Sequence, residues 1–338
     1  MFGEAVSSTF ALALLIALIV TLIATPLVIR LAIVAGAIDK PGEERRIHSK
    51  PTPRWGGLAI YLGVLVAWLL VYPMSHRSPD AALVGPYTVN SLWIMGIGFA
   101  IVAFGMLDDK FQLPASWQAL FLLGCGIALG HPSLGNIRIE GFSVPFMAND
   151  APGGYIAFSE LNSVIFTAVF VFVIAKTMDT IDGIDGLAAG IAAITATTML
   201  ILSLYRQPLV GVLSAGAVGS CLGFLRYNYH PARIFMGTGG AQFLGFFLAA
   251  LSVQGVVKTA AAVALLVPLT LFGVPIFDAI FVVIRRIASR QPITRADKRH
   301  LHHSLLGRGL SQRQAVWVLY AAAILLCSAA ILVVKLSS

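Results

Sequence analysis

Long apolar stretches dominate this chain and limit what it can fold into. Examples cover residues 10–29, 58–71, 164–174 and 260–271. A helix that spans hydrocarbon needs about 20 mostly apolar residues. Of the 338 residues, 58% are hydrophobic and only 11% are charged, whereas about 25% are charged in a typical soluble domain. The composition excludes a disordered chain and predicts a polytopic membrane protein.

About ten segments are long enough to span a bilayer, which predicts an all-α bundle forming one transmembrane domain over 1–338. Their approximate bounds are 10–34, 56–73, 92–107, 117–130, 160–177, 186–205, 208–225, 240–254, 259–284 and 314–335. The ninth contains Pro268 and Pro275, which remove backbone donors, so we expect a broken or kinked helix there. The alternating residues 137–144, with a central Gly141, predict a short hairpin in an outer loop.

The basic residues sort sharply between the two sides of this predicted bundle. With ten spans the connections alternate, and 18 of the 23 Lys and Arg residues fall on one side. Cytoplasmic loops of membrane proteins are enriched in Lys and Arg, so we assign this side to the cytoplasm and both termini to the outside. The formal net charge of +8 is then mostly a matter of topology, and we expect no nucleic-acid partner.

Acidic residues gather in the predicted cytoplasmic connections. Asp108 and Asp109 close the third span, where a solvated helix end is the simplest interpretation. Asp179, Asp182 and Asp185 recur every three residues in a Gly-containing run. That run predicts a tight turn into the sixth span, with backbone donors suited to anions. Carboxylates at membrane helix ends cost energy unless they are paired, solvated or bound to metal, so both groups are candidate sites.

A histidine group lies in the most basic predicted loop, where Arg299 is followed by His300, His302 and His303. A zinc site is disfavoured, because no cysteine is near in sequence and the spacing fits no common zinc pattern. A solvated basic helix is one interpretation. Phosphate binding by imidazole and guanidinium groups is the other.

Two Gly-containing segments precede predicted spans, residues 53–57 with Arg54 and residues 235–240. Each alone is more typical of the start of a helix than of a site. Taken together, the cytoplasmic connections supply carboxylates, basic groups and Gly-rich turns on one face of a membrane. Oxygen ligands for a hard cation, beside cations that bind phosphate, fit a metal-assisted phosphoryl transfer at the lipid surface.

The motifs resemble those of the polyprenyl-phosphate N-acetylhexosamine-1-phosphate transferases, the membrane enzymes that start teichoic acid, O-antigen and peptidoglycan lipid intermediates. The match runs in order over nearly the whole chain, at residues 39–41, 46–48, 51–57, 108–109, 113–115, 182–187, 235–237, 275–278 and 300–303. The His-Leu-His-His form of the last motif is more similar to the enzymes that use UDP-N-acetylglucosamine than to the muramyl-pentapeptide branch.

This resemblance implies that the phosphate of a polyprenyl phosphate, usually undecaprenyl phosphate, attacks the β-phosphorus of a UDP-sugar and releases UMP. It implies a need for Mg²⁺, with Mn²⁺ as an alternative, and leaves a homodimer open. The catalytic residues it implies are Asp108, Asp109, His302 and His303, with the aspartate pair at the metal and the acceptor phosphate. The substrate-binding residues we expect are Arg54, Lys176, Asp182, Asp185, Arg299 and His300.

Four positions depart from the family pattern. Thr238 stands where the family usually has a metal-binding aspartate, Gln118 where it has a basic residue, and Lys176 and Asp179 where it has two asparagines. A neutral hydroxyl is a poorer partner for Mg²⁺ than a carboxylate. We hypothesise that Asp179 replaces the missing metal ligand, while Lys176 pairs with it or contacts phosphate. The alternatives are a lapsed relative that binds lipid phosphate or nucleotide without turnover, an aspartate-rich membrane prenyltransferase, and a transporter.

Overall fold

The computed structural model describes residues 2–40, 51–75, 88–143, 155–204, 207–255, 270–288 and 301–337. These residues form a helical bundle, which confirms the predicted all-α class. Its helices are α1 (Phe2–Ala35), α2 (Gly56–Ser75), α3 (Thr88–Phe111), α4 (Ala115–Gly130), α5 (Glu160–Ile181), α6 (Leu187–Ser203), α7 (Pro208–Asn228), α8 (Gly237–Gly255), α10 (Gly273–Ala288), α11 (Leu301–Gly307) and α12 (Gln312–Ser337).

Five helices in the described part of the chain are long and apolar enough to cross a membrane, judged by length and composition. They are Ser8–Ala35, Asn90–Phe111, Glu160–Ile181, Pro208–Asn228 and Gln312–Leu336. Shorter apolar helices cover Gly56–Val71, Ala115–Gly130, Leu187–Ser203 and Gly273–Val282. Large apolar side chains such as Ile23, Leu120 and Leu325 are exposed, as expected where lipid rather than water surrounds the bundle. The chain is a multi-pass membrane protein.

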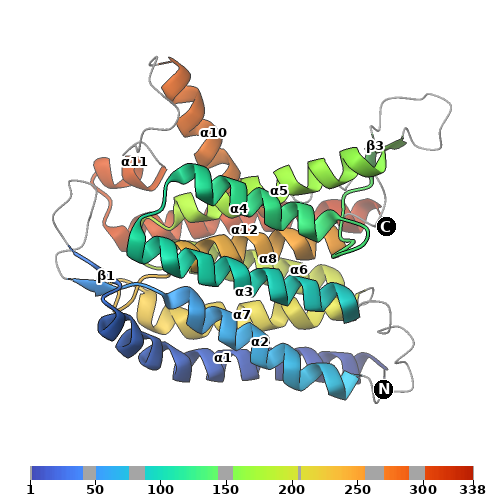
Figure 1. Cartoon of the computed structure of the whole chain (residues 1–338), viewed down its shortest axis with the longest axis horizontal. Coiled ribbons are helices and arrows are strands. Elements are labelled where there is room, and N and C mark those ends of the chain that lie inside the picture. Colours follow the sequence, from blue (N-terminus) through green and yellow to red (C-terminus); the bar gives the residue numbers. More distant parts are fainter. Residues whose placement is uncertain are drawn as a thin grey trace.

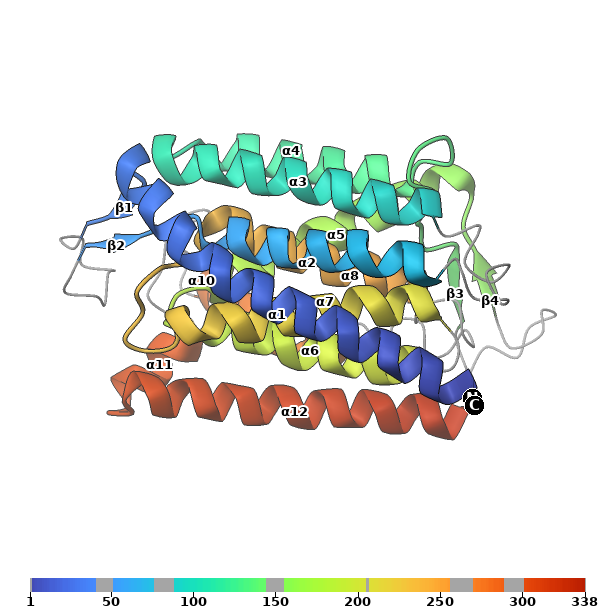
Figure 2. The ribbon, with the colours of Figure 1, turned by 90° about the horizontal axis from the view of Figure 1, so that it is seen from below.

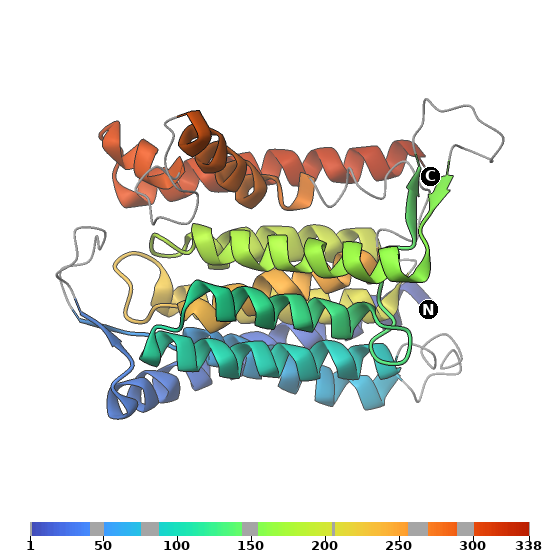
Figure 3. The same ribbon diagram turned by 45° about the horizontal axis from the view of Figure 1, so that its top comes forward.

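Most of the helices lie side by side along one direction, with α8 in the middle of the bundle, whereas α10 projects obliquely from it (Figures 1 and 2). Every residue of α8 from Gly239 to Gln254 is buried. Gly57 and Gly240 allow α2 to approach α8 closely, because a Cβ atom on either would overlap the backbone of the other. Both chain termini lie at one end of the bundle, and α11 lies at the other (Figures 2 and 3).

Two short strand pairs mark the two ends of the bundle. Ile38–Asp39 (β1) pairs antiparallel with Thr52–Pro53 (β2) at the end that carries α11. Gly141–Ser143 (β3) pairs antiparallel with Tyr155–Ala157 (β4) at the end of the termini. The connection between α4 and α5 thus contains a strand pair, but the expected pairing within residues 137–144 is wrong.

The reason for that correction is burial against a helix. Ile137 and Ile139 are each 2% exposed, so their alternation reflects packing on the bundle. The backbone of Ile139 is also satisfied by α5: its N–H donates to Thr167 Oγ1 at 2.9 Å, and its carbonyl accepts from Ser163 Oγ at 2.7 Å. These residues therefore need no strand partner.

The predicted ninth span falls partly outside the described residues, since residues 256–269, including Pro268, are among those not described. Helix α10 begins at Gly273, after a turn at Phe272. Pro275 lies in the first turn of α10, where a missing N–H costs no helical hydrogen bond. Pro275 therefore starts a helix and does not kink one.

Candidate active site

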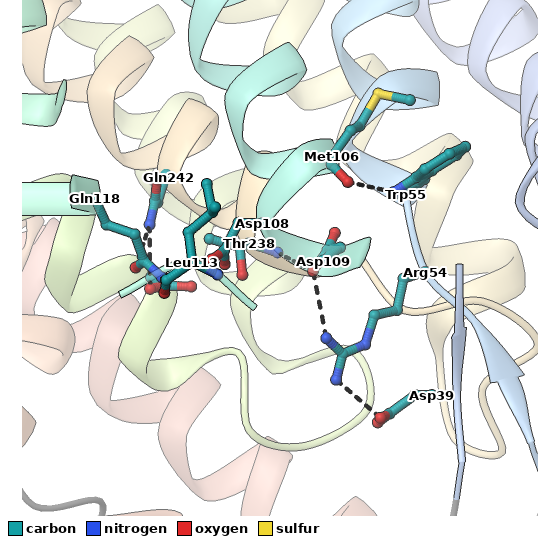
Figure 4. A network of polar contacts seen from close by, with 11 residues as sticks. Asp39, Arg54, Trp55, Met106, Asp108, Asp109, Leu113, Gln118, Thr238 and Gln242 are labelled. Atoms are coloured by element: carbon teal, nitrogen blue, oxygen red, sulfur yellow. Dashed lines mark hydrogen bonds and ion pairs between the residues drawn. The ribbon is translucent and has the colours of Figure 1, made fainter. Parts of the chain in front are cut away.

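Arg54 lies just after β2, between two carboxylates (Figure 4). Its Nη2 donates to Asp39 Oδ1 at 2.8 Å, and its Nη1 lies 3.5 Å from Asp109 Oδ1. The next residue, Trp55, has a φ of +77°, which is uncommon for a residue other than glycine and is a form of strain found at functional sites. The indole Nε1 of Trp55 donates to the Met106 carbonyl at 3.1 Å, which fixes this turn against α3.

Asp109 lies near the end of α3, and its side chain is 2% exposed. Its Oδ1 accepts a hydrogen bond from the Thr238 N–H at 3.2 Å. Its Oδ2 is buried and has no hydrogen-bond partner among the described residues. Gly237 has a φ of +76°, and a Cβ atom there would overlap the Asp109 carboxylate. The turn at 237–238 is thus a cradle around a buried carboxylate with one bare oxygen, and Thr238 contributes its amide to it.

Asp108 makes a different set of contacts from its neighbour. Its Oδ1 accepts from the Leu113 N–H at 3.0 Å and from Gln118 Nε2 at 2.9 Å. Gln118 lies in the first turn of α4, so Asp108 fixes the connection between α3 and α4. Only one of its two carboxylate oxygens is used in these two bonds.

Lys176 and Asp179 form an ion pair on α5, with 2.6 Å between Nζ and Oδ2. The Lys176 ammonium also donates to Gln118 Oε1 at 2.9 Å. Gln242 of α8 donates to the same Asp179 oxygen at 3.3 Å. Of the two roles hypothesised for Lys176, the structure shows the pairing with Asp179.

Asp182 directly follows the C-terminal end of α5, in the turn before α6. It has no hydrogen-bond or ion-pair partner within the described part of the chain. Burial raises the pKa of Asp182 well above its usual range, the negative charges of Asp179, Asp109 and Asp185 raise it further, and Arg54 lowers it. Such a carboxylate is stabilised by a proton or by a bound cation.

Asp185 connects the turn before α6 to the segment before α8. Its Oδ2 accepts from the Ala232 N–H at 3.0 Å and lies 2.7 Å from His230 Nδ1. The motif at residues 235–237 continues from this same segment. His230 was not among the predicted site residues, and its place in the connection before that motif is the only sequence signal that marks it.

The histidine motif is only partly described. The predicted site groups outside the described residues are Arg299, His300 and the side chain of His302. His303 lies in α11, at the same end of the bundle as β1 and β2 (Figure 2). Asp278 of α10, which is 2% exposed, accepts from the Leu301 N–H at 2.6 Å. Asp278 thus anchors the helix that carries the histidines.

Within the cluster around Asp109, carboxylates outnumber basic side chains. It holds two basic groups, Arg54 and Lys176, and five carboxylates, those of Asp39, Asp108, Asp109, Asp179 and Asp182. Carboxylate oxygens are the ligands that Mg²⁺ takes in proteins, and the bare Oδ2 of Asp109 fits that requirement. Among the described residues, no three His, Cys, Asp or Glu side chains are already arranged around one point as a metal site. The chemistry of the donor set fits a divalent cation, although Asp179 is paired with Lys176.

Comparison with known proteins places the chain in a family. Residues 91–256 match glycosyl transferase family 4. A Bacillus subtilis (strain 168) protein named "Probable undecaprenyl-phosphate N-acetylglucosaminyl 1-phosphate transferase" is 38% identical over 310 residues, which cover 91% of this chain and 80% of the relative. The chain belongs to glycosyl transferase family 4. The resemblance seen in the sequence motifs is confirmed.

Other members of the family give the same picture. The decaprenyl-phosphate N-acetylglucosaminephosphotransferase of Mycolicibacterium smegmatis is 35% identical over 340 residues, covering 92% of this chain and 78% of the relative. The phospho-N-acetylmuramoyl-pentapeptide-transferase of Clostridium botulinum (strain Alaska E43 / Type E3) is 29% identical over 303 residues, covering 86% and 85%. The Bacillus and Mycolicibacterium relatives, both named for N-acetylglucosamine transfer, are therefore more similar in sequence to this chain than the Clostridium relative of the muramoyl branch is.

Proposed function

We propose that this chain transfers N-acetylglucosamine 1-phosphate from UDP-N-acetylglucosamine to a polyprenyl phosphate such as undecaprenyl phosphate, releasing UMP, to start a cell-envelope polysaccharide. The observation that carries the proposal is that three separate sequence motifs meet at one carboxylate. Arg54 before α2 and the Thr238 amide at the start of α8 both contact Asp109 at the end of α3. The names of the Bacillus and Mycolicibacterium relatives support this substrate pair.

The reaction joins a phosphate oxygen of the acceptor lipid to the β-phosphorus of the UDP-sugar, while the bond from that phosphorus to the bridging oxygen of UMP breaks. In this proposal Arg54 and Lys176 neutralise phosphate charge, as guanidinium and ammonium groups do. Asp182 and Asp185 face the nucleotide. The histidine motif contributes catalytic groups from His302 and His303, and Arg299 and His300 bind the diphosphate.

The metal would be held by Asp108, Asp109 and Asp179, with Mg²⁺ preferred and Mn²⁺ as the alternative. When bound, it neutralises the negative charge that builds up on the diphosphate oxygens. Asp109 is prepared for this role by its bare, buried Oδ2. For Asp179 to take part, its Oδ1 would hold the metal while its Oδ2 keeps the contact with Lys176, and the third donor of the ammonium is available to a phosphate.

We further propose the topology that suits this reaction. One domain over 1–338 crosses the inner (cytoplasmic) membrane about ten times with a broken ninth span, and the site faces the cytoplasm, as the sidedness of the basic residues indicates. In this topology the nucleotide sugar binds from the cytoplasm at the face where the carboxylates gather, and the acceptor phosphate binds at the lipid surface.

A second candidate function is binding without turnover. Two observations favour it: Thr238 contacts Asp109 through its amide, and Asp179 is already paired with Lys176. In this alternative the chain holds a lipid phosphate or a nucleotide and transfers nothing.

The deciding experiment is transfer of radiolabel from UDP-N-acetylglucosamine to undecaprenyl phosphate by the purified protein in lipid. We expect a lipid-soluble labelled product and stoichiometric UMP when Mg²⁺ is present. An Asp109→Asn variant that remains folded provides the matched control for contaminating enzymes. The proposal fails if the parent protein and this variant give the same background, and saturable binding of undecaprenyl phosphate by an inactive parent would favour the second candidate.

A further inference from the structure

Two glutamines that are not among the predicted site residues lie inside the cluster of charges. Gln118 joins Asp108 to Lys176: its Nε2 donates to Asp108 Oδ1 at 2.9 Å, and its Oε1 accepts from Lys176 Nζ at 2.9 Å. Gln242 is fully buried in α8, and its Nε2 donates to Asp179 at 3.3 Å and to Gln118 Oε1 at 3.5 Å. Figure 4 shows the two amide groups facing each other. Four helices, α3, α4, α5 and α8, meet in this network.

The orientation of both amides is fixed by the charges around them. Each amide has a donor and an acceptor end, and exchanging the two ends would set an oxygen against a carboxylate. The Lys176 ammonium is therefore held between Gln118 Oε1 and Asp179 Oδ2. An ammonium has three donors, so one donor remains beyond these two bonds, on a side chain that is 39% exposed.

The network is costly if packing is its only purpose. A lysine inside a membrane-spanning segment marks a functional site by default, because its charge is expensive there. Gln242 Oε1 is buried with no hydrogen-bond partner among the described residues, and an unpaired buried acceptor also destabilises the fold. An apolar side chain at 242 would avoid that cost. What Gln242 provides instead is a bond that holds Asp179 and Gln118 in place.

We propose that Gln118 and Gln242 are positioning residues that hold the Lys176 ammonium where it contacts a phosphate oxygen of a substrate. The inference rests on the proposed function and deepens it. The phosphate belongs either to the polyprenyl phosphate or to the diphosphate of the nucleotide sugar. What matters is the place of the ammonium and not the helix that carries it: Gln118 Oε1 and Lys176 Nζ are 2.9 Å apart, so a lysine at position 118 brings its ammonium to the same place.

The test is therefore an exchange of the two side chains. Lys176→Gln is compared with the double variant Lys176→Gln/Gln118→Lys, and Gln242→Met replaces the buried amide by an apolar side chain of similar size. Each protein is assayed for thermal stabilisation by undecaprenyl phosphate and, separately, by UDP-N-acetylglucosamine, and for the KM of each substrate and kcat. Gln254→Met, at the opposite end of α8 and also buried, is the control for loss of a buried amide.

We expect Lys176→Gln and Gln242→Met to lose the stabilisation by one of the two ligands and to raise the KM for that ligand about tenfold or more, as loss of an ion contact worth one power of ten implies. The exchanged double variant should recover most of the stabilisation by that ligand and a KM close to the parental value, and Gln254→Met should behave as the parent. The affected ligand identifies the source of the phosphate.

Failure of this inference is distinct from failure of the proposed function. A parent that transfers sugar phosphate while Lys176→Gln and Gln242→Met keep parental KM values overturns the inference alone. If the parent shows no transfer, but a phosphate ligand still stabilises it and Lys176→Gln removes that stabilisation, the proposed transfer is overturned and the inference stands. If Gln242→Met only lowers the melting temperature of the ligand-free protein, the network is structural and the inference is wrong.

Discussion

Gly237→Ala is the sharpest perturbation of the cradle around Asp109. Gly237 has a φ of +76°, and a Cβ atom on it would overlap Asp109 Oδ2 and lie 3.1 Å from the Cγ atom of that side chain. Gly36 offers a matched control, because its φ is +74° but no atom lies within 4 Å of the position that a Cβ atom would take there. The two alanine variants therefore share the backbone strain and differ in the contact with the carboxylate.

The expected magnitudes follow from that difference. An L-residue in the left-handed region costs about 1–2 kcal/mol, so both variants should lose stability by that amount. Only Gly237→Ala has to push the Asp109 carboxylate away, by roughly 0.5–1 Å if the carbon atoms are to regain a separation of about 3.5–4.0 Å. A misplacement of about 1 Å in a catalytic constellation can lower the rate by about 100-fold. We therefore expect kcat to fall by that order in Gly237→Ala and to stay near the parental value in Gly36→Ala.

The assay is transfer of sugar phosphate to undecaprenyl phosphate, measured with thermal unfolding of the same two preparations. The comparison separates loss of stability from loss of kcat, because the backbone strain is common to both variants and only Gly237→Ala displaces the Asp109 carboxylate. Equal losses of kcat in Gly237→Ala and Gly36→Ala would refute the cradle, since backbone strain would then explain the whole effect.

Three further outcomes are expected. Asp179→Asn should abolish Mg²⁺-dependent transfer and the added Thr238→Asp should restore part of it, whereas undiminished transfer in Asp179→Asn rules out the substitute ligand. Because the pKa of Asp182 is raised, this carboxylate takes up a proton as the pH falls before an ordinary aspartate would, and the negative charge that attracts a cation to the neighbouring Asp109 and Asp179 is then reduced. The Mg²⁺ concentration for half-maximal transfer should therefore rise as the pH falls, and this rise should be smaller in Asp182→Asn. A membrane-impermeant thiol reagent added to intact cells should label Ser78→Cys and leave Ser49→Cys unlabelled, because position 78 is assigned to the outside and position 49 to the cytoplasm. The three native cysteines are buried and should add no background, and labelling of the second variant contradicts the assigned sidedness.

The sequence motifs predicted several residues that the structure brings together, but not what each of them contacts. The motif with Arg54 and the pair Asp108 and Asp109 were identified from residue types at predicted helix ends, and the structure brings Arg54 to Asp109. Gln242 was missed, although a polar side chain in an otherwise apolar span is a recognised sign of function. The ion pair of Lys176 and Asp179 was one of the alternatives that the sequence left open.

The sequence by itself determined the all-α membrane class, because burial in lipid requires long apolar segments whose backbone groups are satisfied within each helix. Helix contacts were decided by the tertiary structure alone. Helix α2 is apolar all round, so no amphipathic pattern shows which of its faces turns inward. Gln118 and Gln242 lie 124 positions apart, and their contact depends on how α4 and α8 are rotated within the bundle. That rotation is set by packing at close approaches such as Gly57 against Gly240, which no local pattern of residues encodes.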